Sequence, residues 1–243
     1  MDSPHEGAAQ QDLPQSARYA LVGARIALVD RMLDGHALLI RDGAILGSIP
    51  EDQVPAEHAV HRLAGGVLAP GLIDVHMHGA LGYGFNDAST GTVREIGRVL
   101  LDSGVTTVLP TLASAAQESL LAALDAIDEA GDADDTARMP GAHLEGPYLS
   151  PAQRGAQTAA DLRSPDDGSA AALLDRAASI RMMSLAPELP GAEDLIRRLV
   201  AHDIVAAAGH SDGTIDDLRR AQDAGLTHVI HLYSSQSTTR REG

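Results

Sequence analysis

The apolar residues of the first third of the chain form short runs of the kind that predict β-strands. Two such runs cover Tyr19–Val29 and His36–Ile49. Within the second run, Asp42-Gly43 separates ALLIR from AILGSI, and an Asp-Gly pair between two apolar runs is a strong hairpin signal. These features predict a small antiparallel β unit over Arg18–Leu63, within a small β domain at residues 17–66, and without a convergent set of catalytic side chains.

From Val67 onwards, apolar runs alternate with segments of helical periodicity. The predicted strands are Val67–Val75, Val105–Pro110, Gly141–Leu144, Ile180–Leu185, Ile204–Ala208 and Thr227–Leu232. The predicted helices lie near Thr92–Ser103, Ala115–Glu129, Pro165–Ala178, Gly191–His202 and Thr214–Ala224. Strands separated by helices of this length predict parallel βαβ units.

Polar side chains that could act as ligands or catalytic groups lie just after the predicted strands. They are His76, His78, Thr111, Glu145, Glu188, His210 and His231. In a (β/α)8 barrel these positions lie on one face around one pocket. A doubly wound sheet is the alternative, but no glycine phosphate fingerprint follows the first predicted strand. We therefore predict an α/β fold over residues 67–243, a (β/α)8 barrel with about six of its eight βα units.

The stretch VLAPGLIDVHMHGALGYGF, Val67–Phe85, carries the first part of a candidate site. Residues i and i+2 of a strand point to the same side, so His76 and His78 can offer imidazole nitrogens to one metal ion. Asp74 shares their parity, and a glycine-rich loop follows. A strand end with two solvated histidines is the competing interpretation of this motif taken alone.

Three further residues extend the candidate set. Glu145 follows the third predicted barrel strand, His210 the fifth and His231 the sixth. Four imidazoles and a carboxylate at one end of a barrel suit Zn²⁺ or a similar divalent ion with open positions for water. His143 shares parity with Glu145 and is a weaker candidate.

The amino-acid composition argues against some classes of partner and limits the available metal ligands. The 243 residues carry a net charge of −16 and only 2% aromatic residues, which argues against nucleic acid and anionic membranes as partners. There is no cysteine, so thiolate ligands are excluded, and all 18 basic residues are arginine. Many binuclear metal barrels bridge their ions with a carboxylated lysine. Without lysine, a carboxylate must take that place, and Glu145 stands where one is needed.

The ends of the chain complete the domain prediction. Residues 1–16 are polar, contain Pro4 and Pro14, and predict a disordered tail instead of a signal peptide. No run of 18 apolar residues predicts a membrane span, so a cytoplasmic location is expected. The sequence leaves the oligomeric state open, with a homodimer as one option.

The chain resembles the N-acetylglucosamine-6-phosphate deacetylases of the amidohydrolase superfamily. The similar stretches are APGLIDVHMHGALGYGFND, GVTTVLPTLASA, GAHLEGPYLSPAQRGAQ, LAPELPGAEDLIRRL, VAAAGHSDGT and THVIHLYSS. The resemblance implies a (β/α)8 barrel beside a small β-sandwich that is built partly from the N-terminal strands. It also implies a divalent metal held by Glu145, His210 and His231, with a second metal at His76 and His78.

The resemblance implies hydrolysis of the N-acetyl amide of an amino-sugar phosphate. The metal would polarise the acetyl carbonyl and activate water, while a carboxylate transfers protons. In the family that carboxylate is an Asp after the eighth strand, a position beyond Gly243. We therefore assign no catalytic acid–base residue within the chain, and expect the 243 residues alone to be poorly folded and inactive.

Two substrate-contact positions depart from the family. The family usually continues from HLEGP to Gly-Thr-His, whereas this chain has Gln157 in place of the His. After the metal-binding His, the family usually has Leu-Tyr-Asn-Ala-Met, whereas this chain has Ser234 and Ser235 in place of Asn-Ala. Arg241 resembles the family's phosphate-binding Arg. Two alternatives stay open: hydrolysis of another N-acyl or cyclic amide, and a metal-binding fragment without catalytic activity.

Overall fold

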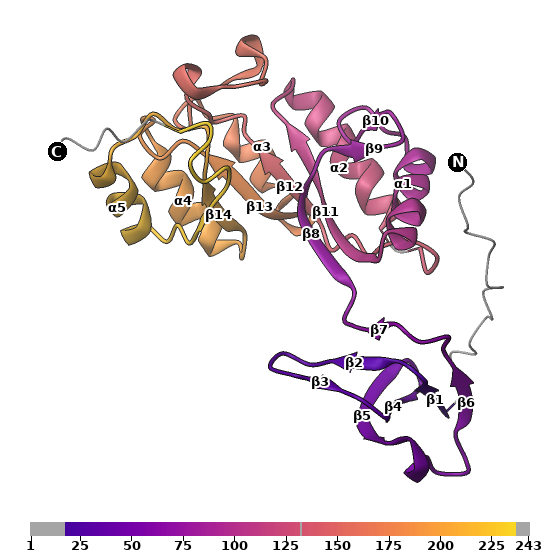
Figure 1. Cartoon of the computed structure of the whole chain (residues 1–243). Helices are drawn as coiled ribbons and strands as arrows, with labels where there is room; N and C mark the ends of the chain where they lie inside the picture. The colour runs from indigo at the N-terminus through magenta and orange to yellow at the C-terminus, as the bar shows by residue number, and fades with distance from the viewer. Residues whose placement is uncertain (1–17, 132, 237–243) are drawn as a thin grey trace, which may run out of the picture. The chain divides into compact units, whose positions relative to one another are not determined.

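The computed structural model describes residues 18–131 and 133–236 (Figure 1). The chain divides into two compact units, Met1–Pro70 and Gly71–Gly243. The division falls inside the segment 67–75, which the sequence pattern predicts as a single strand. Arg241 and the predicted tail over residues 1–16 lie outside the described residues.

The described part of the first unit, from Arg18 to Pro70, consists of two small sheets and one 3-10 turn. Its elements are β1 (Arg18–Val22), β2 (Arg25–Ala27), β3 (Met32–Leu33), β4 (His36–Arg41), β5 (Ala44–Pro50), η1 (Glu51–Gln53), β6 (Ala59–Arg62) and β7 (Val67–Leu68). The sheet orders are β5-β4-β1-β6 and β3-β2-β7. The pairs β1 with β4, β4 with β5 and β2 with β3 are antiparallel. However, β1 pairs parallel with β6 and β2 pairs parallel with β7, so both sheets are mixed and not wholly antiparallel as predicted.

The hairpin between β4 and β5 is confirmed at the predicted turn. Arg41 pairs with Ala44, which leaves Asp42 and Gly43 as the two turn residues. Both have positive φ, 52° for Asp42 and 75° for Gly43. Positive φ at both central residues is the type I′ geometry, whose twist matches the flanking strands.

The second unit is built on one six-stranded parallel sheet. Its strands are β8 (Leu72–Met77), β11 (Val105–Ala113), β12 (Ala142–Glu145), β13 (Ile180–Leu185), β14 (Val205–Ala208) and β15 (His228–Val229). A short antiparallel ribbon, β9 (Gly79–Ala80) with β10 (Tyr83–Gly84), follows β8.

The sheet order is β15-β14-β13-β12-β11-β8, so each strand lies beside its predecessor in the sheet (Figure 1). A doubly wound sheet reverses its strand order at a switch point, and this sheet does not. The sequential order is that of a partial (β/α)8 barrel, which confirms the predicted α/β fold class.

Helices connect the parallel strands. The α-helices are α1 (Thr90–Asp102), α2 (Gln117–Ala130), α3 (Ala170–Leu174), α4 (Ala192–Ala201) and α5 (Ile215–Asp223), and the 3-10 turns are η2 (Pro151–Gln153), η3 (Ala159–Asp161) and η4 (Ala177–Ser179). Ser89 caps α1 by accepting the Thr92 N–H, and Thr214 and Asp217 form a capping box on α5. Within residues 18–131 and 133–236, no helix has the length and apolar character needed to cross a membrane.

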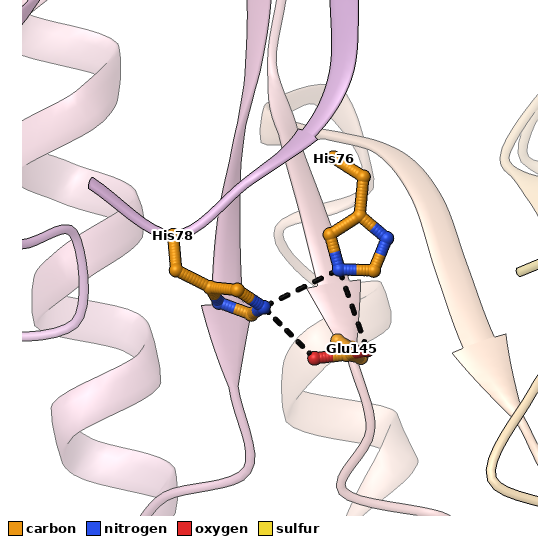
Figure 2. A group of neighbouring side chains, drawn as sticks. All are labelled: His76, His78 and Glu145. Carbon is orange, nitrogen blue, oxygen red and sulfur yellow. Dashed lines mark hydrogen bonds and ion pairs between the residues drawn. The ribbon is translucent and has the colours of Figure 1, made fainter. Parts of the chain in front are cut away.

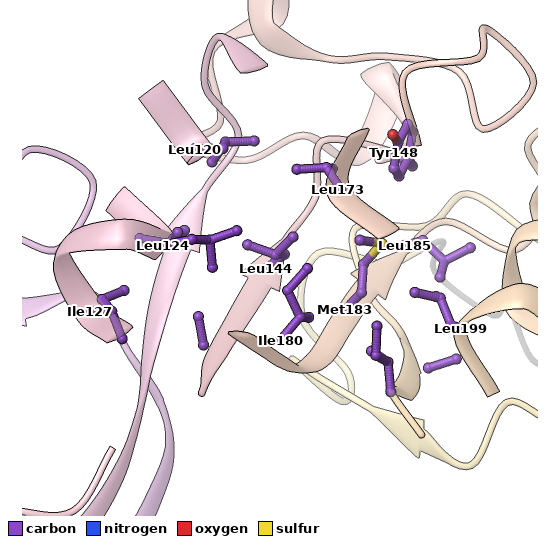
Figure 3. Close-up of a cluster of buried hydrophobic side chains, with 14 of the residues drawn as sticks. Leu120, Leu124, Ile127, Leu144, Tyr148, Leu173, Ile180, Met183, Leu185 and Leu199 are labelled. Carbon is purple, nitrogen blue, oxygen red and sulfur yellow. The ribbon is translucent and has the colours of Figure 1, made fainter. Parts of the chain in front are cut away.

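The core of the second unit lies between the sheet and its helices (Figure 3). Leu124 and Ile127 of α2, Leu144 of β12 and Met183 of β13 are all at most 1% exposed. Burial of one such side chain stabilises a fold by roughly 1.5–3 kcal/mol. All four residues of β12 are buried, so this strand, which ends in Glu145, is covered on both faces.

Three predicted elements are interrupted or much shorter in the structure. The strand predicted over Val67–Val75 is interrupted at Pro70-Gly71, where β7 ends before β8 begins. A Cβ on Gly71 would lie 2.0 Å from Thr106 Oγ1, so close approach of the two chain segments requires glycine here. The helix predicted over Pro165–Ala178 is shortened to α3 and η4, after Gly168 at φ 85°. The last strand is the short β15.

Candidate metal centre

Two histidines from the end of β8 point at the carboxylate of Glu145 (Figure 2). His76 Nε2 lies 3.3 Å from Glu145 Oε1, and His78 Nε2 lies 3.1 Å from Glu145 Oε2. The two imidazole Nε2 atoms are 3.3 Å apart. The backbone N–H of His76 donates to Asp74 Oδ1 at 3.0 Å, so the carboxylate that shares their parity fixes the backbone of this strand end.

Two more histidines reach the same carboxylate from the other side of β12. His210, which follows β14, places Nε2 3.2 Å from Glu145 Oε1. His231, which follows β15, places Nε2 2.6 Å from the same oxygen. The structure therefore brings together all five side chains that the sequence pattern selects as metal ligands.

The centre is buried at its base and open at its mouth. Glu145 is 2% exposed and His210 6%, whereas His78 is 47% and His231 34% exposed. A buried carboxylate is thus reached from solvent past partly exposed imidazoles. This arrangement leaves room for a ligand to approach the nitrogens, as a catalytic metal site requires.

The backbone at two of the histidines is strained. His210 has φ 47° and His231 has φ 51°, a left-handed conformation that is uncommon for residues other than glycine. Such conformations cost about 1–3 kcal/mol each and persist where surrounding contacts impose them. The conformation turns the chain sharply after β14 and β15, and both side chains reach Glu145.

A hydrogen bond selects the tautomer of His210. Its Nδ1 lies 2.8 Å from the carbonyl oxygen of Gln153. A carbonyl only accepts, so Nδ1 carries the proton and the Nε2 of a neutral His210 ring presents a lone pair towards Glu145. Metal-binding histidines commonly have this second hydrogen bond, which fixes the ring orientation.

Glu188 holds the loop that carries His210. Its Oε2 accepts from Ser211 Oγ and its Oε1 accepts from the Asp212 N–H, both at 2.7 Å. Asp212 in turn accepts from the Gln153 side chain at 2.9 Å. Glu188 follows β13, as its place among the polar residues at strand ends predicts, but its bonds are to the loop and not to the histidines.

His143 lies behind the centre as a neutral ring. It is fully buried, its Nε2 is 2.7 Å from Ser184 Oγ, and its Nδ1 is 3.3 Å from Thr111 Oγ1. Burial lowers the pKa of His143 to about 3. Its ring meets that of His76 at right angles, with centroids 4.8 Å apart. The parity of His143 with Glu145 indicated its direction, but no local pattern indicated that Ser184 would be its partner.

The charges around Glu145 are tightly coupled. Burial would raise the pKa of Glu145, but hydrogen bonds from His210, His76, His78 and His231 outweigh it and hold the pKa well below its usual range. The hydrogen bond to Glu145 raises the pKa of His78 and of His210. Protons and metal ions therefore compete for the same imidazole nitrogens.

The donor set fits a divalent metal ion. The Nε2 atoms of His76 and His78 face each other at 3.3 Å, and two such nitrogens need a proton or a cation between them. The potential ligand atoms form two groups that share Glu145, one with His76 and His78 and one with His210 and His231. Within each group the atoms lie within 4.8 Å of one another. Imidazole and carboxylate are the ligands of mononuclear and binuclear zinc-type sites.

The predicted substrate-contact residues lie at different depths. Gln157 is buried and hydrogen-bonds to Ser114 and Glu145. Ser234 is exposed, and its N–H donates to the His231 carbonyl at 2.7 Å. Ser235 is half-buried, and its carbonyl accepts from the Ser211 N–H at 3.2 Å. Arg241 lies outside the described residues.

Sequence reasoning missed the residues that support the centre. Ser114 and Asn86 do not end a predicted strand with a charged group, so the pattern gave no signal for them. Asn86 exchanges two hydrogen bonds with the backbone of Ala113, both at 3.0 Å, and so ties the loop after β10 to the end of β11.

Comparison with curated proteins identifies relatives of known activity. The chain is 33% identical over 226 residues to the N-acetylgalactosamine-6-phosphate deacetylase of a Shewanella species, a match that covers 91% of this chain and 57% of that protein. It is 35% identical over 223 residues to the N-acetylglucosamine-6-phosphate deacetylase of Bos taurus, covering 84% and 53%. The chain thus spans a little over half the length of these relatives.

Solved structures are similar over the same extent. N-acetylglucosamine-6-phosphate deacetylase from Pasteurella multocida superposes with a TM-score of 0.81 at 30% identity, covering 87% of this chain and 56% of that one. A mutant of the Mycobacterium smegmatis deacetylase in complex with N-acetyl-D-glucosamine-6-phosphate gives a TM-score of 0.82 at 30% identity, covering 93% and 58%.

The family assignment rests on the larger part of the chain. Residues 67–239, which include the whole parallel sheet and all five candidate ligands, match the model of the amidohydrolase family. Members of this family are metal-dependent, in agreement with the His/Glu cluster. This chain belongs to the amidohydrolase family.

Proposed function

We propose that this chain forms the metal centre of a deacetylase that hydrolyses the N-acetyl amide of N-acetylglucosamine 6-phosphate to glucosamine 6-phosphate and acetate. The observation that carries the proposal is the convergence of four imidazoles on buried Glu145 at the strand ends of an amidohydrolase barrel. Relatives at 33–35% identity that act on 6-phosphorylated N-acetyl sugars support the choice of substrate.

The proposed ligands are Glu145, His210 and His231 for a first divalent ion, with His76 and His78 available for a second. Zinc is the proposed metal because imidazole and carboxylate ligands with open positions suit it. Bound there, zinc supplies Lewis-acid polarisation of the acetyl carbonyl and activation of water.

The chain's own residues prepare this centre before substrate arrives. Gln153 holds the proton of His210 at Nδ1, so that Nε2 is free to act as a ligand. The neutral ring of His143 packs behind His76 and excludes water there. In the proposal, Ser234 and Ser235 contact the sugar phosphate, because they stand where the resembling deacetylases have an Asn-Ala pair that contacts the phosphate. Arg241 is proposed to bind the phosphate through its fork-shaped guanidinium.

The proton-transfer group is proposed to be the Asp that follows the eighth barrel strand in the resembling deacetylases. Near the centre, Asp74 already accepts a hydrogen bond from the backbone of His76, and Asp212 accepts one from Gln153. We give neither of them the acid–base role. A phosphorylated sugar does not cross a lipid bilayer unaided, so the proposed location of this reaction is the cytoplasm.

N-acetylgalactosamine 6-phosphate is a second candidate substrate. The Shewanella relative, matched over 91% of this chain, is named for that sugar. The two sugars differ only in the configuration at C4, so the acetyl amide and the phosphate to be recognised are the same.

Acetate release by the protein expressed from its own gene tests the proposal. Release from N-acetylglucosamine 6-phosphate is expected with added Zn²⁺ and is expected to stop with a chelator. Parallel assays with N-acetylgalactosamine 6-phosphate rank the two substrates by kcat/KM. Zinc binding without acetate release from either sugar would reject the deacetylase and favour a metal-binding chain without catalytic activity.

A further inference from the structure

Gln157 is a buried glutamine whose two amide ends are both used within the protein. It follows η2, in the segment that leads away from β12, and it is 7% exposed. Its Oε1 accepts the backbone N–H of Ser114 at 2.8 Å, and its Nε2 donates to Glu145 Oε2 at 2.9 Å. Arg154 also donates to the Gln157 carbonyl oxygen at 2.9 Å, which fixes the backbone beneath the side chain.

The orientation of this amide follows from its partners. A backbone N–H can only donate, so the atom that faces Ser114 must be the oxygen. An ionised carboxylate can only accept, so the atom that faces Glu145 must be the nitrogen. Both constraints agree, and they leave Gln157 bonded to the protein at both ends instead of presenting its amide to a sugar.

The bond from Gln157 differs from the other contacts of Glu145. The four imidazoles meet Glu145 through nitrogens that a metal ion would use as ligands. An amide nitrogen is not a metal ligand of this kind, so its bond to Oε2 persists when an ion binds. Oε2 has two lone pairs, one of which accepts from Gln157 while the other faces His78. The plane of the carboxylate is thereby held with Oε1 towards His210 and His231.

We propose that Gln157 is a positioning residue, which acts on the metal centre through Glu145 and does not contact the sugar. The inference rests on the proposed function only in that the centre binds a divalent cation. It assigns to Gln157 a role other than the sugar contact that the sequence resemblance implies. Loss of an outer partner of a metal ligand commonly lowers metal affinity roughly 10–100-fold.

Zn²⁺ affinity, measured by competition with a chromophoric chelator, tests the inference without substrate. Gln157→Leu keeps most of the side-chain volume but removes the donor, and is expected to bind Zn²⁺ roughly 10-fold or more weakly than wild type. The Co²⁺ form of this variant is expected to show a shifted visible absorption spectrum, because the ligand field changes with the carboxylate.

Controls separate positioning from folding. Gln222→Leu, at an exposed position of α5, is expected to leave Zn²⁺ affinity unchanged. If Gln157→Leu does not fold, as judged by its thermal transition, Gln157→Asn replaces it. That side chain is one methylene shorter and cannot span from Ser114 to Glu145, so the same loss of affinity is expected.

The kinetic comparison decides between the two roles. A positioning residue is expected to lower kcat while KM for N-acetylglucosamine 6-phosphate stays close to that of wild type. Wild-type Zn²⁺ affinity in a folded Gln157→Leu or Gln157→Asn variant, with a raised KM, would overturn the inference and identify a sugar contact. A wild-type protein that binds no Zn²⁺ would instead reject the proposed metal centre.

Discussion

Glu145 Oε1 lies 2.6 Å from His231 Nε2, although 86 residues separate the two along the chain. Strands β13 and β14 stand between β12 and β15 in the sheet. The contact therefore spans the end of the sheet and not a pair of neighbouring strands. It makes Glu145 the common partner of ligands from both sides of β12.

Glu145→Gln is expected to weaken Zn²⁺ binding by more than the roughly 10–100-fold that loss of an outer partner costs. The variant keeps the shape of the side chain but removes its charge, and the chain has no lysine to supply a carboxylated bridge. Chelator competition measures the change. Glu118→Gln, at an exposed position of α2, is the control. Wild-type affinity in Glu145→Gln would exclude this carboxylate as a ligand.

Glu188→Ala is expected to lower both stability and Zn²⁺ affinity. The substitution removes the acceptor of hydrogen bonds from Ser211 and Asp212, and hydrogen bonds to charged groups contribute about 1.5–3 kcal/mol each. A loss of about 3 kcal/mol, the lower end for two such bonds, corresponds to a fall in Tm of roughly 6–12 °C at this chain length.

Glu193→Ala is the matched control for Glu188. Glu193 forms exposed ion pairs with Arg197 and Arg220, and such pairs contribute about 0–1 kcal/mol. Calorimetry of both variants, together with chelator competition, makes the comparison. Equal small losses of Tm would show that Glu188 does not hold the His210 loop.

Thr214→Ala is expected to destabilise the second unit by about 1 kcal/mol at pH 7, because it removes the N-cap of α5. Hydrogen bonds from Thr214 lower the pKa of Asp217. The stability that this carboxylate contributes is therefore present above its unfolded pKa of about 3.9, and it is lost as the pH falls through the lower folded value.

The pH dependence separates the cap from other effects of the Thr214 substitution. The Tm difference between wild type and Thr214→Ala is expected to be full at pH 5–7 and to shrink at pH values below about 4. Thermal denaturation across this range measures it. A difference that grows on acidification would contradict the capping-box explanation.

Gly71→Ala is expected to destabilise the junction of β8 and β11. The added Cβ would lie 2.0 Å from Thr106 Oγ1, so either the backbone or the Thr106 side chain must move. Overpacking of this kind costs about 1–3 kcal/mol. Gly91→Ala, whose Cβ would have only Ser89 Oγ within 4 Å, at 3.8 Å, is the control, and unfolding midpoints in urea compare the two.

The fold class and the candidate ligands could be predicted because both depend on local pattern. Apolar runs alternating with helical segments predict βαβ units, and polar residues at the strand ends follow the geometry of such units. Asp42-Gly43 specified its turn through the same kind of local signal. In each case the relevant information lies within a few residues of the feature.

The support of the centre could not be predicted because it depends on the folding of long connections. Gln157 reaches Ser114 across 43 positions, and Glu188 reaches Ser211 across 23. No periodicity within either segment specifies such pairs. The predicted helix is likewise shortened because the chain turns at Gly168 before α3 begins. Where the helix starts depends on tertiary contacts, which the local pattern does not specify.

The sequential strand order of the second unit sets a geometric condition on its chemistry. β8 and β15 stand at opposite edges of the six-stranded sheet, and in a flat sheet five strand spacings would place them about 24 Å apart. Yet the ring centroids of His76 and His231 are 5.0 Å apart. The sheet is thus bent into an arc, and the ligands meet because their side chains point towards the inside of that arc. Any change that flattens the arc would separate the ligands without altering one of them.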